Sequence, residues 1–206
     1  MIEVILTNHD LEWALDLSKQ SYAKRSVNKK GEMIYKPRKE RRMSSLVGKL
    51  GEMGAYNWLL AEGYLPDPWF AMNDDAPDIV TRNPVMRIEV KSWKKSQWDK
   101  NLGRSIPSNQ FEKICKCNHL IFWMYMDLYK PWDNRIETLG DVCALFKKYP
   151  FSVTLAEYSW CRDLKRYEAV RDIEVPNGDG LILRSKQVVK WLHDIKDLRE
   201  DAPKRL

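Results

Sequence analysis

Long apolar runs, paired cysteines and signal-peptide features are missing from this sequence. No stretch approaches the roughly eighteen apolar residues that a membrane span requires, and no basic start precedes an apolar block at the N-terminus. Four cysteines in 206 residues are too few and too irregularly spaced for a disulfide scaffold. We therefore expect a cytoplasmic protein without a membrane partner. The cysteines are expected to be free thiols, with a zinc or iron–sulfur site as the alternative.

Histidine chemistry and nucleotide-type phosphate loops are also unsupported. The three histidines lie in different segments without ligand spacing, and the chain has neither a glycine-rich phosphate loop nor a nucleophile elbow. We therefore assign the histidines no chemistry.

Positive charge is concentrated in one segment. The net charge is +6, and residues 24–42 contain nine Lys or Arg and two Glu, an excess of +7, so the rest of the chain sums to −1. A basic segment of this kind, with Tyr22 just before it and Tyr35 within it, is typical of proteins with a phosphate-rich partner such as DNA. A solvated loop is the alternative. The residues of this segment that we expect to bind nucleic acid are Lys36, Arg38, Lys39, Arg41 and Arg42.

Hydrophobic periodicity predicts an α/β protein. Apolar residues make up 44% of the chain and charged residues 31%, which suits a soluble domain. Helices are predicted over 10–24, 44–62, from about 108, 139–148 and 185–200; strands near 70 and over 78–81, 85–92, 119–126, 153–159 and 182–184; and a loop over 93–105. We expect one domain over 1–206, with a core at about 44–160, a helix and basic arm at 1–43, and a C-terminal strand and helix at 161–206.

Two segments carry the candidate chemistry: Pro77-Asp78 and, eleven residues later, Glu89-Val90-Lys91. Alternation along a strand places Glu89 and Lys91 side by side on one face. If Asp78 lies on the neighbouring strand, its carboxylate can share a divalent cation such as Mg²⁺ with Glu89. Lys91 could then position the attacking water or neutralise charge on a phosphate. The alternative is an amphipathic hairpin with a solvated charged face.

This pattern resembles the PD-(D/E)XK nuclease superfamily, which has the restriction-endonuclease-like fold. The similarity covers residues 44–126 and includes Gly48-Lys49-Leu50-Gly51-Glu52 on the first helix, in the manner of Holliday-junction-resolvase-like and phage nucleases. It implies a central mixed sheet flanked by helices, with additional N- and C-terminal helices. Small residues on the face of Gly48, Glu52, Ala55 and Leu59 would bring the helix close to the sheet and aim Glu52 inward.

The resemblance also implies roles and partners. Asp78 and Glu89 would be metal ligands, Lys91 the catalytic lysine, Glu52 an accessory acid and ligand, and Gln110 a residue that orients substrate or a metal-bound water. The cofactor would be Mg²⁺ or Mn²⁺, and the substrate double-stranded or branched DNA, with a homodimer left open. A catalytically silent DNA-binding protein and an RNA-directed nuclease are the alternatives. In the segment after Lys91, Trp93 and Trp98 could stack on bases or pack on the domain, and the expected phosphate contacts are Lys94, Lys95 and Arg104.

Overall fold

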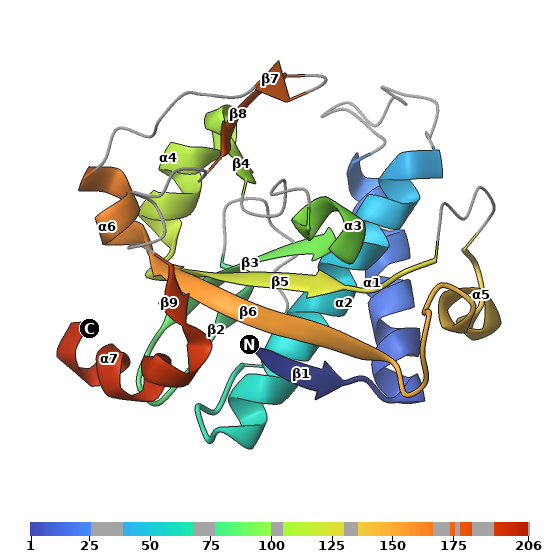
Figure 1. Cartoon of the computed structure of the whole chain (residues 1–206), viewed down its shortest axis with the longest axis horizontal. Helices are drawn as coiled ribbons and strands as arrows, with labels where there is room; N and C mark the ends of the chain where they lie inside the picture. Colours follow the sequence, from blue (N-terminus) through green and yellow to red (C-terminus); the bar gives the residue numbers. More distant parts are fainter. Residues whose placement is uncertain are drawn as a thin grey trace.

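The computed structural model describes residues 1–25, 39–67, 77–99, 105–129, 136–166, 174–175, 178–182 and 192–205. It is an α/β structure in which helices flank a curled mixed sheet (Figure 1). Within these segments, none of the helices has the length and apolar character needed to cross a bilayer.

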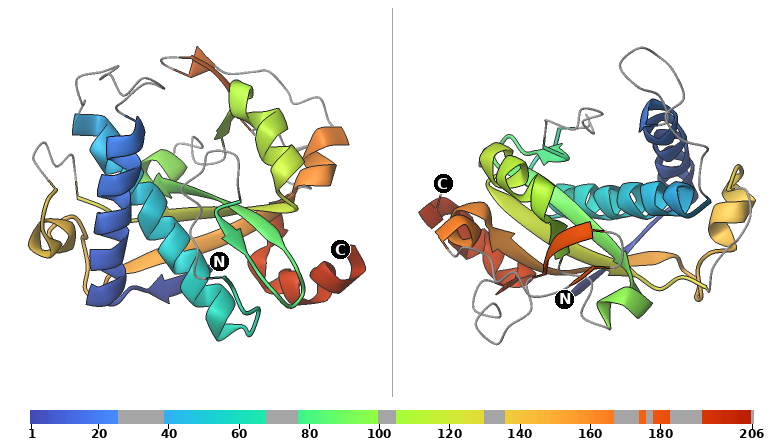
Figure 2. Two further views of the ribbon diagram at one scale, coloured as in Figure 1. Left: turned by 180° about the vertical axis from the view of Figure 1, so that it is seen from behind. Right: turned by 90° about the horizontal axis from the view of Figure 1, so that it is seen from above.

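The first two helices lie side by side along one face of the sheet (Figure 2). Helix α1 spans Asn8–Arg25 and begins with a reciprocal cap, in which the Thr7 hydroxyl accepts from the Asp10 amide at 3.2 Å and the Asp10 carboxylate accepts from the Thr7 amide at 2.7 Å. Helix α2 spans Lys39–Ala61 and stops at Gly63, whose φ of 82° suits a residue without a side chain. The predicted end of this helix is confirmed.

The sheet has the strand order β1-β6-β5-β3-β2. Strand β3 (Arg87–Lys94) and strand β5 (Leu120–Met126) are parallel, and helix α4 (Ser108–Cys117) connects them. Strands β1 (Ile2–Ile5), β2 (Ile79–Val80) and β6 (Ser152–Trp160) pair with their neighbours in antiparallel fashion. Strand β9 (His193–Asp194) continues along the β6 edge that β1 occupies.

Strand β5 is buried on both faces, because its residues alternate between two hydrophobic clusters. Phe122 and Met124 belong to the cluster under α1 and α2, whereas Ile121 and Trp123 belong to the cluster formed with α4 and α6 (Cys161–Arg166). On β6 the alternation shifts at Ala156, where two residues oppose Trp123 in a bulge. Strand β5 therefore supports helices on both faces of the sheet.

Two glycines allow α2 to lie against the sheet. A Cβ atom added at Gly51 would come within 1.6 Å of the Ser92 hydroxyl oxygen, and one at Gly54 within 2.0 Å of a Val153 methyl carbon. By contrast, a Cβ at Gly48 would meet nothing within 4 Å. The expectation that Gly48 brings the helix close to the sheet is therefore wrong, because the sheet contacts the helix one turn further along.

Several smaller elements surround the sheet. They are α3 (Lys95–Trp98), α5 (Leu139–Cys143), a second sheet of β4 (Ser105–Pro107), β8 (Gly178–Ile182) and β7 (Glu174–Val175), the 3-10 helix η2 (Ile195–Asp197) and α7 (Leu198–Arg205). The loop predicted over 93–105 is wrong at both ends, because β3 continues to Lys94, α3 follows it, and Ser105 begins β4. Residues 100–104 lie outside the described residues. The helix predicted over 139–148 ends at Cys143.

The predicted C-terminal helix over 185–200 is wrong at residues 193–194. Residues 193–194 pair with β6 as β9, so α7 begins only at Leu198. Pairing with a sheet edge has overridden the local apolar periodicity here. Residues 183–191 and the strand expected near Phe70 lie outside the described residues.

Candidate functional site

Asp78 lies where the two strands of a hairpin separate at the edge of the sheet. Strands β2 and β3 pair only through Ile79–Ile88 and Val80–Arg87. One residue before this ladder, the Asp78 carboxylate accepts a hydrogen bond from the Val90 amide at 2.7 Å. The side chain thereby replaces a backbone acceptor that the diverging strand no longer supplies, and its position is fixed by β3.

Glu89 and Lys91 project from the same side of β3, as alternation along a strand requires. The Lys91 Nζ donates to Glu89 Oε1 at 2.6 Å. The side chain of Lys91 is only 20% exposed and that of Glu89 only 12%, so this ion pair is shielded from water far more than a surface pair. Ile88 and Val90 point the other way, into the cluster beneath α2.

Glu52 comes to the same region from α2. It is buried, and the Lys49 Nζ donates to both of its carboxylate oxygens, at 2.8 and 2.6 Å. Lys49 precedes Glu52 by three residues, a spacing at which side chains meet on a helix surface. Their side chains are 11% and 9% exposed.

The electrostatics of Asp78 place these groups around one carboxyl. Burial, followed by repulsion from Glu52 and then from Glu89, raises the pKa of Asp78 well above its usual range. Lys91 and the Val90 amide oppose that rise in pKa. Two carboxylates that each repel Asp78, and that are each paired with a lysine, form an arrangement that a divalent cation would relieve.

Asn118 is a site neighbour that the sequence did not reveal. It follows α4, is buried, and its Nδ2 donates to the Ile114 carbonyl at 3.0 Å and to Glu89 Oε2 at 3.4 Å. Its Oδ1 is buried without a hydrogen-bond partner. Only the crossover from β3 through α4 brings this residue beside Glu89. Lys49, in contrast, could have been found from its spacing to Glu52.

Gln110 is not brought into this group. It lies exposed in the first turn of α4, and no hydrogen bond joins it to Glu52, Asp78, Glu89 or Lys91 in the part of the chain that the structure describes. Its implied role in orienting substrate remains a prediction.

The segment after Lys91 packs on the domain. Trp98 is buried with its ring centroid 5.1 Å from that of Tyr125, and Trp93 packs partly buried on the same cluster. Base stacking by Trp98 would require it to leave that cluster. Lys94 ends β3, and Lys95 donates to Asp99 at 2.8 Å on the surface of α3. Arg104 lies outside the described residues.

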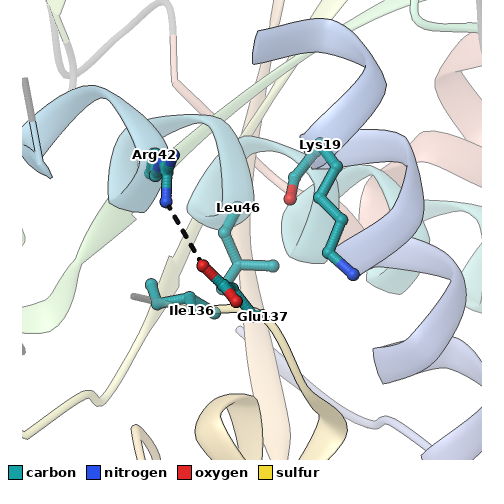
Figure 3. A pocket seen from close by; sticks show the side chains of 6 residues that line it. Lys19, Arg42, Leu46, Ile136 and Glu137 are labelled. Atoms are coloured by element: carbon teal, nitrogen blue, oxygen red, sulfur yellow. Dashed lines mark ion pairs between the residues drawn. The ribbon is translucent and has the colours of Figure 1, made fainter. Parts of the chain in front are cut away.

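The basic segment over 24–42 is described only at its two ends, the last two residues of α1 and the first four of α2. Lys36 and Arg38 lie outside the described residues, as do the side chains of Lys39 and Arg41. Arg42 lies 3.9 Å from Glu137 at a pocket of about 440 Å³ between α1, α2 and residues 136–137 (Figure 3). The lining residues are Ser18, Lys19, Arg42, Leu46, Ile136 and Glu137. Glu52, Asp78, Glu89 and Lys91 do not line this pocket.

The donor set determines which metal the residues fit. The acidic group offers carboxylate oxygens alone, which are the donors that Mg²⁺ and Mn²⁺ prefer. Among the described residues, no three acidic, histidine or cysteine side chains already converge into a complete site, and Glu52 and Glu89 are turned toward lysines. Mg²⁺ needs only one or two carboxylates besides water and phosphate, so the residues fit that ion without a full protein cage.

Comparison with known proteins gave no match. No protein-family model, curated protein or solved structure resembles the chain closely enough to match it. The interpretation of the site thus depends on its residues and their geometry.

Proposed function

We propose that this chain is a metal-dependent deoxyribonuclease of the PD-(D/E)XK type, with a restriction-endonuclease-like core. One observation carries the proposal: Glu52 on α2 and Glu89 and Lys91 on β3 surround the carboxyl of Asp78, which directly precedes β2 at the sheet edge and has a raised pKa. Chance placement of charged residues would leave them solvated on separate surfaces.

Asp78 and Glu89 would hold Mg²⁺ or Mn²⁺, with Glu52 as a further ligand. When bound, the cation supplies Lewis-acid polarisation of the phosphate and a more acidic water. Lys91 already lies beside Glu89, where its ammonium can stabilise charge that develops on a phosphodiester oxygen or orient the attacking water. The Val90 amide keeps Asp78 in place, and Asn118 limits the rotation of Glu89.

DNA is the substrate that the charge distribution favours. The basic segment over 24–42 leads into α2, the helix that carries Glu52. Lys94 ends β3, and Lys95 follows it directly. Cations on both chain segments that supply the site would contact backbone phosphates without reading base sequence. An RNA substrate and a silent DNA-binding protein are outcomes of the test below.

The test is a cleavage assay on plasmid, branched DNA, single-stranded DNA and RNA, in Mg²⁺ and in excess EDTA. We expect cleavage of DNA in Mg²⁺ alone, and its loss in Asp78→Ala, Glu89→Ala and Lys91→Ala with folding retained. The matched control is Lys147→Ala, because Lys147 pairs with Asp127 beyond the other end of β5. Cleavage in EDTA would refute the metal mechanism. DNA binding without cleavage would favour the silent protein, and cleavage confined to RNA the RNA-directed nuclease.

A further inference from the structure

Lys49 holds the Glu52 carboxylate by both oxygens inside the protein. The two distances, 2.8 and 2.6 Å, and the near-complete burial of both side chains distinguish this pair from the other i,i+3 pair nearby. That pair, Lys19 and Asp16 on α1, is 3.6 Å apart with side chains 47% and 69% exposed. Lys49 and Glu52 therefore form a desolvated contact in which each charge depends on the other.

The corresponding contact on β3 leaves one carboxylate oxygen to a neutral donor. Lys91 binds Oε1 of Glu89, while Oε2 faces the Asn118 amide at 3.4 Å. Glu52, in contrast, has Lys49 on both oxygens. If Glu52 serves a cation, Lys49 must release at least one of these oxygens.

A largely buried ammonium that loses its counterion needs another anion, because an unpaired buried charge is strongly unfavourable. In the part of the chain that the structure describes, Glu52 is the acid that forms an ion pair with Lys49. The anion that a phosphodiester substrate brings to this site is its phosphate, which a lysine binds as a compact point charge.

We propose that Lys49 is a second phosphate-binding lysine, whose transfer from Glu52 to the DNA backbone couples cation binding to DNA binding. The inference rests on the proposed nuclease function and adds to it a residue that the sequence pattern did not assign. Without DNA, Lys49 competes with the cation for Glu52. With DNA, the phosphate takes Lys49 and leaves Glu52 to the cation.

The first measurement is Mn²⁺ affinity without DNA, by isothermal titration calorimetry. Lys49→Gln should bind Mn²⁺ about tenfold more tightly than the unaltered protein, within the roughly 5- to 150-fold range typical of coupled ligands. Lys19→Gln is the matched control and should leave Mn²⁺ affinity unchanged. Circular dichroism establishes that each variant is folded.

The second measurement is the affinity for a short DNA duplex in EDTA and in Ca²⁺, which is chosen to limit cleavage. The DNA affinity in Ca²⁺ divided by that in EDTA measures the coupling between cation and DNA, because coupling free energies are reciprocal. Lys49→Gln should lower this ratio about tenfold within the same roughly 5- to 150-fold range, whereas Lys19→Gln should preserve it. A lysine with only a structural role would not change the ratio.

Glu52→Gln provides an independent route should Lys49→Gln fail to fold. This variant releases Lys49 without a cation, so DNA affinity in EDTA should rise about tenfold, a coupling of ordinary size. The double variant Lys49→Gln/Glu52→Gln should lose that gain. A gain that persists in the double variant reflects simple loss of negative charge and overturns the inference, as does an unchanged coupling ratio in a folded Lys49→Gln. Absence of Mn²⁺ binding and of cleavage in the unaltered protein would instead refute the proposed function.

Discussion

Two glycines of α2, Gly48 and Gly54, should respond in opposite ways to substitution by alanine. Gly48→Ala adds a methyl group to open space, whereas Gly54→Ala places one 2.0 Å from a methyl carbon of Val153, which is fully buried on β6. An alanine in a helix is worth about 0.5–1 kcal/mol over glycine. Gly48→Ala should therefore stabilise the protein by about that amount, since nothing opposes the gain.

At Gly54 the helix gain is outweighed. Overpacking of this kind costs about 1–3 kcal/mol, because β-branched Val153 has few alternative rotamers and the helix must move away from the sheet. Because the overlap with Val153 is severe, the cost lies in the upper part of this range, about 2–3 kcal/mol. After the helix gain is subtracted, the net loss is about 1–2.5 kcal/mol, or roughly 2–10 °C in Tm for a chain of this size. Urea and thermal unfolding followed by circular dichroism measure both variants. Equal shifts at Gly48 and Gly54, or stabilisation by Gly54→Ala, would refute the close approach of α2 to β6.

Two further predictions concern the acidic group. Asn118→Ala should lower the cleavage rate about tenfold, which is the lower end of the losses typical when a residue that orients a metal ligand is removed. An unchanged rate in a folded variant would show that Asn118 only donates to the Ile114 carbonyl and does not position Glu89. Because the folded pKa of Asp78 lies above its ordinary 3.8, the unfolded chain loses this proton first, so the associated stability falls as pH rises from 3.8 through the folded value. In EDTA, the Tm advantage of Asp78→Asn over the unaltered protein should therefore grow as the pH rises above 3.8, and a constant difference would contradict the raised pKa.

Local sequence patterns predicted the elements that carry the site. The apolar positions of α2 and the alternation around Glu89 indicated a helix and a strand, and each lies near its expected position. Such signals are readable because side-chain direction follows from helix or strand periodicity alone. The same alternation placed Glu89 beside Lys91.

Contacts between distant segments could not be predicted in this way. The proximity of Asn118 to Glu89 depends on the course of α4, and that of β9 to β6 on a pairing that interrupts the expected C-terminal helix. Strand β1 was missed although burial alternates along it. Ile2 and Val4 are partly buried, whereas Glu3 and Ile5 are exposed. A four-residue strand has too little periodicity to stand out until its partner is known.

The pairing of β1 with β6 has a consequence for synthesis on the ribosome. Glu3 and Ser152 are hydrogen-bonded across 149 residues, so the first strand to emerge waits for nearly the last strand of its sheet. Until β6 leaves the exit tunnel, β5 presents an unpaired and strongly apolar edge. The nascent chain can form the β2–β3 hairpin and the β3–α4–β5 unit early, since their contacts are closer in sequence. Vectorial folding would therefore assemble the acidic group before the far half of the sheet, and the apolar β5 edge that is left unpaired is a surface that chaperones are suited to shield.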